Sequence, residues 1–137
     1  MTLRSCLILG ALVLLAGCGS GPKTVPVSGR VTLDNKPLAN ATLQFVPVSG
    51  EKASELSAVG TTNENGEYSL VLNTDSGTKG AVVGKYKVII MLGAQSEAET
   101  KPTFHKQLPE RYNRKTQLEC EVPAGGRADA NFDLTTR

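Results

Sequence analysis

Short runs of alternating apolar and polar residues, separated by turn-forming residues, constrain the fold of this chain more than any other feature. Such alternation places one set of side chains on a single face of a β-strand. Seven runs follow one another: Val25–Leu33, Ala41–Phe45, Ser57–Thr62, Tyr68–Leu72, Lys85–Leu92, Leu118–Val122 and Ala128–Leu134. No helical period or internal repeat interrupts them. The sequence therefore predicts an all-β fold, a seven-stranded antiparallel β-sandwich.

Three details of these runs are specific enough to test. The Asn65-Gly66 pair lies between two runs and predicts a hairpin turn. Gly29 falls on the apolar face of its run and indicates a possible β-bulge. The run Lys85–Leu92 has apolar residues on both faces, which favours a central strand covered on each side.

The first residues have the pattern of a secretory signal peptide. Arg4 precedes the apolar run Leu7–Ala16, and small residues follow. This run is too short for a transmembrane helix, which needs about 20 apolar residues. We expect residues 1–17 to be a cleaved signal peptide, 18–24 a lipidated N-terminus with a flexible tether, and 25–137 the β-sandwich domain. Of 137 residues, 120 would remain, enough for one domain with its own core.

The end of the apolar run, Leu15-Ala16-Gly17-Cys18, resembles the lipobox of bacterial lipoproteins. The resemblance implies that Cys18 carries diacylglycerol, that cleavage occurs before it, and that its new amino group is acylated, with palmitate as a typical chain. Two or more acyl chains give durable membrane attachment. Gly19, in place of the aspartate that retains lipoproteins of Gram-negative bacteria at the inner membrane, favours the outer membrane. The alternative is an ordinary secreted protein in which Cys18 has no role.

Cysteine chemistry beyond this anchor is limited. Cys6 lies in the signal peptide and Cys18 is used for lipid, so Cys120 has no partner for an intramolecular disulfide. Cys120 shares the apolar face of its run with Leu118 and Val122. We therefore expect a small buried hydrophobic residue rather than a catalytic thiol.

A second resemblance covers about Val25 to Leu134 and concerns the order of several motifs. These motifs resemble a carboxypeptidase regulatory-like or transthyretin-like domain of the kind found in small planctomycete lipoproteins. The resemblance implies a prealbumin-like (immunoglobulin-like) sandwich and no settled activity. The matching segments are Val27–Thr32, Lys36–Ala41, Thr61–Tyr68, Gly84–Val88 and Leu108–Asn113.

Residue counts argue against an enzyme, a metal site or a cofactor. Related hydrolases and iron dioxygenases use several histidines, whereas His105 is the single histidine here and stands in a polar loop. Asn63, Asn65 and Glu67 offer oxygens to calcium, but a calcium loop usually has more carboxylates, so the hairpin turn is the favoured interpretation. The net charge is only +2, and no basic patch stands out in the sequence. Both observations argue against nucleic acid as a partner.

The long polar segment 93–116 contains the most interesting candidate contact. Tyr112, next to Arg111, either meets a partner protein or glycan, or folds back to hold the loop on the sandwich. We favour the second role, and keep Tyr112 and Arg111 as possible partner contacts.

These observations predict a lipid-anchored, non-enzymatic envelope protein. It would be bound to the membrane through Cys18, with Gly19 favouring the outer membrane, and would face the periplasm or the exterior. Its sandwich would be a structural or protein-interaction module for an unknown envelope protein. The alternative is a carbohydrate-binding or adhesion module, although tryptophan is absent and aromatic residues make up only 4% of the chain.

Overall fold

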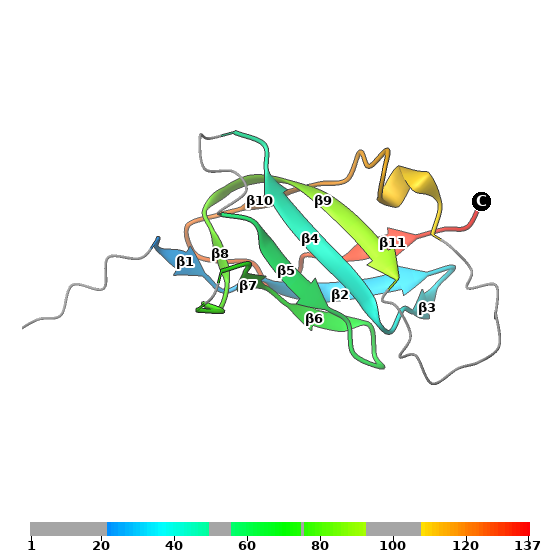
Figure 1. Cartoon of the computed structure of the whole chain (residues 1–137). Helices are drawn as coiled ribbons and strands as arrows, with labels where there is room; N and C mark the ends of the chain where they lie inside the picture. Colours follow the sequence, from blue (N-terminus) through cyan, green and yellow to red (C-terminus); the bar gives the residue numbers. More distant parts are fainter. Residues whose placement is uncertain (1–21, 50–55, 75, 93–107) are drawn as a thin grey trace, which may run out of the picture.

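The computed structural model describes residues 22–49, 56–74, 76–92 and 108–137. Within these ranges the chain is all-β apart from one short 3₁₀ helix (Figure 1). The elements are β1 (Thr24–Val25), β2 (Ser28–Leu33), β3 (Lys36–Pro37), β4 (Ala41–Pro47), β5 (Ala58–Thr61), β6 (Glu67–Ser69), β7 (Val71–Leu72), β8 (Ala81–Val82), β9 (Gly84–Leu92), η1 (Glu110–Tyr112), β10 (Glu119–Val122) and β11 (Phe132–Leu134). Each of the seven predicted runs contains strand. None of the described residues forms a helix long and apolar enough to cross a membrane.

The larger sheet has five strands in the order β10-β9-β4-β5-β7, and all its neighbours are antiparallel. Its longest pairing joins β4 to β9, from Ala41 opposite Leu92 to Pro47 opposite Tyr86. The alternation in β4 is regular, because Ala41, Leu43 and Phe45 are buried while the residues between them are partly exposed.

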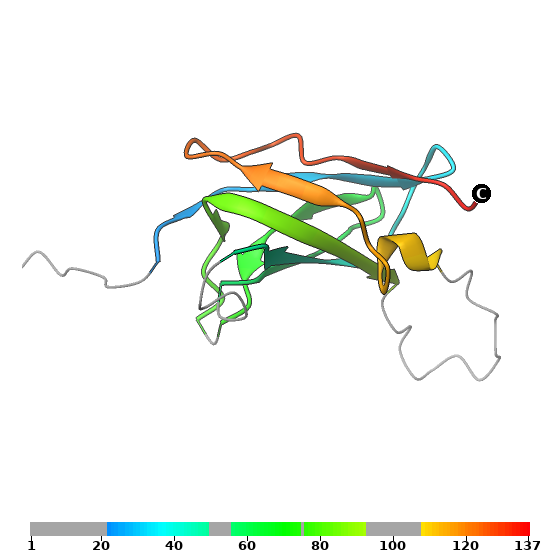
Figure 2. The same cartoon turned by 90° about the horizontal axis from the view of Figure 1, so that it is seen from above.

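The second sheet has the order β11-β2-β3, and β6 also pairs with β2. Its pairings are antiparallel except for β11, which runs parallel to β2. A small separate ribbon pairs β1 with β8 at the end of the molecule where the described chain begins. Seen from above, the two sheets form two layers (Figure 2).

The core fills the space between the layers. Phe45 of β4 is fully buried at its centre, with ring centroids 6.4 Å from Tyr68 of β6 and 6.2 Å from Phe132 of β11. Its third aromatic neighbour is Tyr86 of the same sheet, at 5.8 Å. Phe45 therefore contacts both sheets, and the all-β sandwich predicted from sequence is confirmed.

The hairpin turn is present, but the strand that follows it is divided. The Asn63 amide donates to Glu67 O, and the Gly66 amide donates to Asn63 O, both at 2.9 Å. Of the Asn-Gly pair, only Gly66 has a positive φ, at 76°. After the turn, β6 pairs with β2 of the second sheet, whereas β7 pairs with β5 of the first. The predicted single strand Tyr68–Leu72 therefore changes sheets at Leu70.

The prediction for Lys85–Leu92 was half correct. The strand β9 is central, between β10 and β4, but only one of its faces is covered. Tyr86, Val88 and Ile90 are buried, while Met91 on the other face is 43% exposed and Ile89 is half-buried. On the outer face, the β-branched Ile89 matches a pleated surface without a second layer over it.

Candidate functional site

A polar hollow lies over β2 and β6, next to the turn that precedes β6. It is open to solvent and has a volume of about 560 Å³. Hydroxyl, amide and charged groups make up most of its wall. We call it the β2–β6 hollow, and it is lined by Ser28, Gly29, Arg30, Thr61, Asn63, Glu67, Tyr68, Ser69, Ala128 and Asn131.

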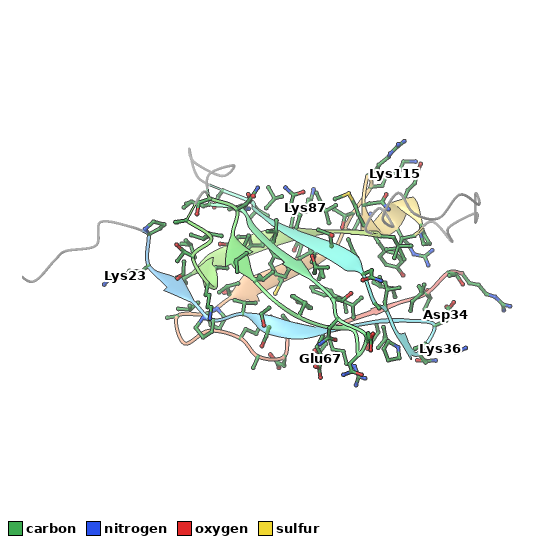
Figure 3. The ribbon with its side chains drawn as sticks, turned by 60° about the horizontal axis from the view of Figure 1, so that its bottom comes forward. Lys23, Asp34, Lys36, Glu67, Lys87 and Lys115 are labelled. Carbon is green, nitrogen blue, oxygen red and sulfur yellow. The ribbon has the colours of Figure 1, made fainter. Side chains whose placement is uncertain are left out.

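Strand register places the polar groups of the hollow side by side. Ser28 lies opposite Ser69, and Arg30 lies opposite Glu67. Directly opposite residues on antiparallel strands point to the same face, so a pair of hydroxyls stands next to a pair of opposite charges. Glu67 projects at the margin of the molecule, far from Lys87 and Lys115 (Figure 3).

The wall of the hollow next to β2 is a bulge in the segment that runs alongside β2 and leads into β11. Val27 pairs with Arg127, an offset of 100 residues, but Val31 pairs with Phe132, an offset of 101. One extra residue therefore lies between Arg127 and Phe132. The sequence indicated a bulge at Gly29; β2 keeps an unbroken register with β6 there, so the bulge is in the neighbouring strand instead.

Side chains complete the hydrogen bonds that this bulge interrupts. The Ala130 amide donates to Ser28 O at 3.1 Å, so a regular ladder would next join the Arg30 amide to Ala130 O. Instead the Arg30 amide donates to Asn131 Oδ1 at 2.9 Å. Ala130 O accepts from the buried Tyr68 hydroxyl at 2.5 Å. Tyr68 and Asn131 thus fix the bulge from its two sides.

Gly29 permits the C-terminal strand to pass this closely. A Cβ at position 29 would lie 2.0 Å from Ala130 O and 2.4 Å from the carbonyl carbon. Both are backbone atoms, so no side-chain rotation relieves the clash. The glycine therefore serves the close approach of two strands.

The turn beside the hollow is held by hydrogen bonds among its own polar atoms. Asn63 Oδ1 accepts from the amides of Asn65 at 2.9 Å and Glu67 at 3.0 Å. Arg30 Nε donates to Asn65 O at 3.0 Å and links the turn to β2. Asn63 Oδ1 is thus used within the turn, in agreement with the hairpin interpretation rather than a calcium loop. The described residues hold no group of three or more His, Cys, Asp or Glu side chains placed to bind a metal.

Tyr112 and Arg111 lie on η1, at the opposite end of the molecule from β1. The Tyr112 side chain is 8% exposed, and its hydroxyl accepts from the Thr135 amide at 3.0 Å. The Arg111 guanidinium lies 4.9 Å from the centre of the Tyr112 ring and donates to Thr135 O and Arg137 O, each at 2.6 Å. This geometry agrees with the role of Tyr112 in holding its segment on the sandwich, and it leaves Arg111 the more exposed of the two.

Cys120 is buried and points toward a charged neighbour. Burial raises the pKa of its thiol, while the Arg127 guanidinium, 3.7 Å from Sγ, acts in the opposite direction. Arg127 is also bound to Asp129 Oδ1 at 3.2 Å. A thiol with a raised pKa is a poor nucleophile, in keeping with its predicted packing role.

The sequence did not predict that Arg30, Glu67 and Asn131 share one site. The polar positions flanking the Asn65-Gly66 turn are visible in the sequence and could have suggested Arg30 and Glu67. Asn131 gives no such signal, because its role depends on the bulge. Cys18 and His105 lie outside the described residues.

No protein-family model, curated protein or solved structure matches this chain. The candidate site therefore depends on the geometry of the chain itself.

Proposed function

We propose that this protein is a lipid-anchored, non-enzymatic component of a bacterial cell envelope. Its β-sandwich is a structural or protein-interaction module, of the carboxypeptidase regulatory-like or transthyretin-like kind that its motifs resemble. The observation that carries the proposal is Leu15-Ala16-Gly17-Cys18 at the end of an apolar run. Thioether-linked diacylglycerol on Cys18 would fix the domain to a membrane, most simply the outer membrane.

The arrangement of the domain supports this proposal. Thr24, where β1 begins, is only six positions after Cys18 in the sequence. An anchored Cys18 would thus lead almost directly into a folded domain. The β2–β6 hollow supplies a polar surface on which an envelope protein would dock.

The mass of the native product tests the anchor. We expect a chain that begins at Cys18 and carries the mass of diacylglycerol plus one acyl chain. Cys18→Ala should abolish the lipid and release the protein from the membrane. Cys120→Ala is the matched control and should leave both unchanged. A native product with an unmodified Cys18, or with residues 1–17 attached, would contradict the proposal.

A carbohydrate-binding or adhesion module is the second candidate, and the β2–β6 hollow is the observation that favours it. Its paired hydroxyls and amides are groups that bind sugar hydroxyls. Tyr68, Tyr86 and Tyr112 are buried and offer no exposed ring for stacking. A glycan array should therefore compare Ser28→Ala and Glu67→Gln with Glu119→Gln, on the other sheet. Saturable binding lost only in the first two variants would favour this candidate over a protein partner.

A further inference from the structure

Two of the three exposed large hydrophobic side chains among the described residues lie at the end of the molecule where β1 begins, whereas the third, Met91, lies near the other end of β9. Among the described residues, the exposed large hydrophobics are Val48 at 50%, Val83 at 48% and Met91 at 43%. Val83 directly follows β8, which pairs with β1 through Thr24 opposite Val82. The Val48 amide donates to Lys85 O at 3.1 Å, so Val48 also lies close to this corner.

Uncharged, exposed residues extend the same surface. Val122 pairs with Gly84, which brings Pro123 and the turn 123–126 next to Val83. A Cβ at Gly126 would lie 3.1 Å from the Pro26 ring, so that turn also adjoins β1. We call this surface the tether end; it consists of Pro26, Val48, Val83, Pro123 and Ala124.

The backbone on both sides of Val83 is fixed by the fold. The buried Tyr86 hydroxyl donates to Val82 O at 2.7 Å and fixes β8 against β9. Gly80, just before β8, has φ 96°, and Gly84, at the start of β9, has φ 148°, so β8 and the corner after it are flanked by backbone that few other residues adopt. Val83 is thus exposed on a corner fixed at both sides.

The tether limits how far this surface stands from a bilayer. Six residues reach at most about 20 Å when fully extended, and a flexible chain of that length spans about 13 Å on average. A domain of this size has a diameter of about 35 Å. Because the tether is shorter than the domain and enters at β1, the tether end is the part of the domain nearest the anchor.

We propose that the tether end is a membrane-contact surface, on which Val48 and Val83 enter the headgroup region of the bilayer that holds the lipid anchor. This inference rests on the proposed function, because it requires lipid on Cys18. Lys23 lies at this end, whereas Lys36 lies at the opposite end and marks the face turned away from the membrane (Figure 3).

Fluorescent labels at the two ends test the proposal. The lipidated protein that begins at Cys18, with Cys120→Ala, is reconstituted into vesicles of phosphatidylethanolamine and phosphatidylglycerol. It carries an environment-sensitive dye at Val48→Cys, Val83→Cys or, as the control, Lys36→Cys. We expect a blue shift and loss of quenching by aqueous iodide at positions 48 and 83, and neither change at position 36.

The outcomes separate the inference from the proposed function. Protein that does not float with the vesicles overturns both. Protein that floats while the labels at 48 and 83 stay as accessible to iodide as the label at 36 overturns the membrane-contact surface alone. Equal protection at all three positions also overturns it, since the contact would then lack orientation.

Discussion

At the residue scale, Gly29 is the position where two strands approach too closely for any side chain. In Gly29→Ala the new Cβ would meet the Ala130 carbonyl at 2.0 Å, so the bulge must move. We expect the unfolding free energy to fall by about 1–3 kcal/mol, the range for overpacking, as measured by urea denaturation. Gly125→Ala is the matched control, because a Cβ there meets nothing within 4 Å. Equal stability of the two variants would contradict this role of Gly29.

Also at the residue scale, substitution of Tyr112 tests whether this residue holds its segment on the sandwich or contacts a partner. Tyr112→Ala removes a buried ring and the acceptor of the Thr135 amide, so we expect a loss of about 3–5 kcal/mol in unfolding free energy. Arg111→Ala removes an exposed side chain and should cost about 1 kcal/mol or less. A Tyr112→Ala protein as stable as the wild type would instead keep the partner-contact hypothesis open for both residues.

At the scale of the element, the bulge between Arg127 and Phe132 depends on two side chains acting together. Tyr68→Phe leaves Ala130 O without its donor, and Asn131→Ala leaves the Arg30 amide without its acceptor. Each should cost about 1–3 kcal/mol. Because both fix one backbone segment, the double variant should lose less than the sum, by about 1 kcal/mol.

Urea unfolding of the four proteins in this cycle gives the coupling. Asn131→Asp is the control, since it keeps a side-chain oxygen at the same position. Strictly additive losses would show that Tyr68 and Asn131 stabilise the molecule independently.

The elements also show where sequence reasoning succeeds. Alternation was sufficient to assign the buried faces of β4 and β10, because each of these strands has one covered face from end to end. Cys120 and Val122 are buried as that pattern predicts. The pattern failed at Leu70, because a strand that changes sheets keeps its alternation while its partners change.

The candidate site was less predictable than the fold. A glycine on an apolar face indicates close approach, but not which strand carries the irregularity. Asn131 replaces a backbone acceptor across 101 positions of sequence, and no local pattern encodes such a substitution. In β9, the apolar character of Ile89 reflects strand propensity, which sequence alone does not separate from burial.

At the scale of the whole molecule, burial of weak acids in the core makes the folded state less stable as the pH becomes alkaline. Burial raises the pKa of the Cys120 thiol above its ordinary value of 9.0 and the pKa values of the Tyr68 and Tyr86 phenols above 10.0. The unfolded chain releases these protons first, so the folded state binds more protons in this range. Unfolding free energy therefore falls as pH rises, by about 1.4 kcal/mol per pH unit for each proton retained only in the folded state.

The decline should begin near the ordinary pKa of the thiol and steepen once the phenols of the unfolded chain ionise. Burial of Tyr112 is outweighed by its hydrogen bonds with Thr135 and Arg111, so its pKa is lowered and its contribution has the opposite sign, which partly offsets the decline.

Urea unfolding between about pH 7 and pH 11 measures the curve. Cys120→Ala should move the onset up to the range of the tyrosines without removing the decline. A stability that is constant to the alkaline end, or an onset unmoved in Cys120→Ala, would mean that the core does not hold these protons. The proposed membrane contact has no part in this effect, so the same curve is expected for the protein produced without lipid.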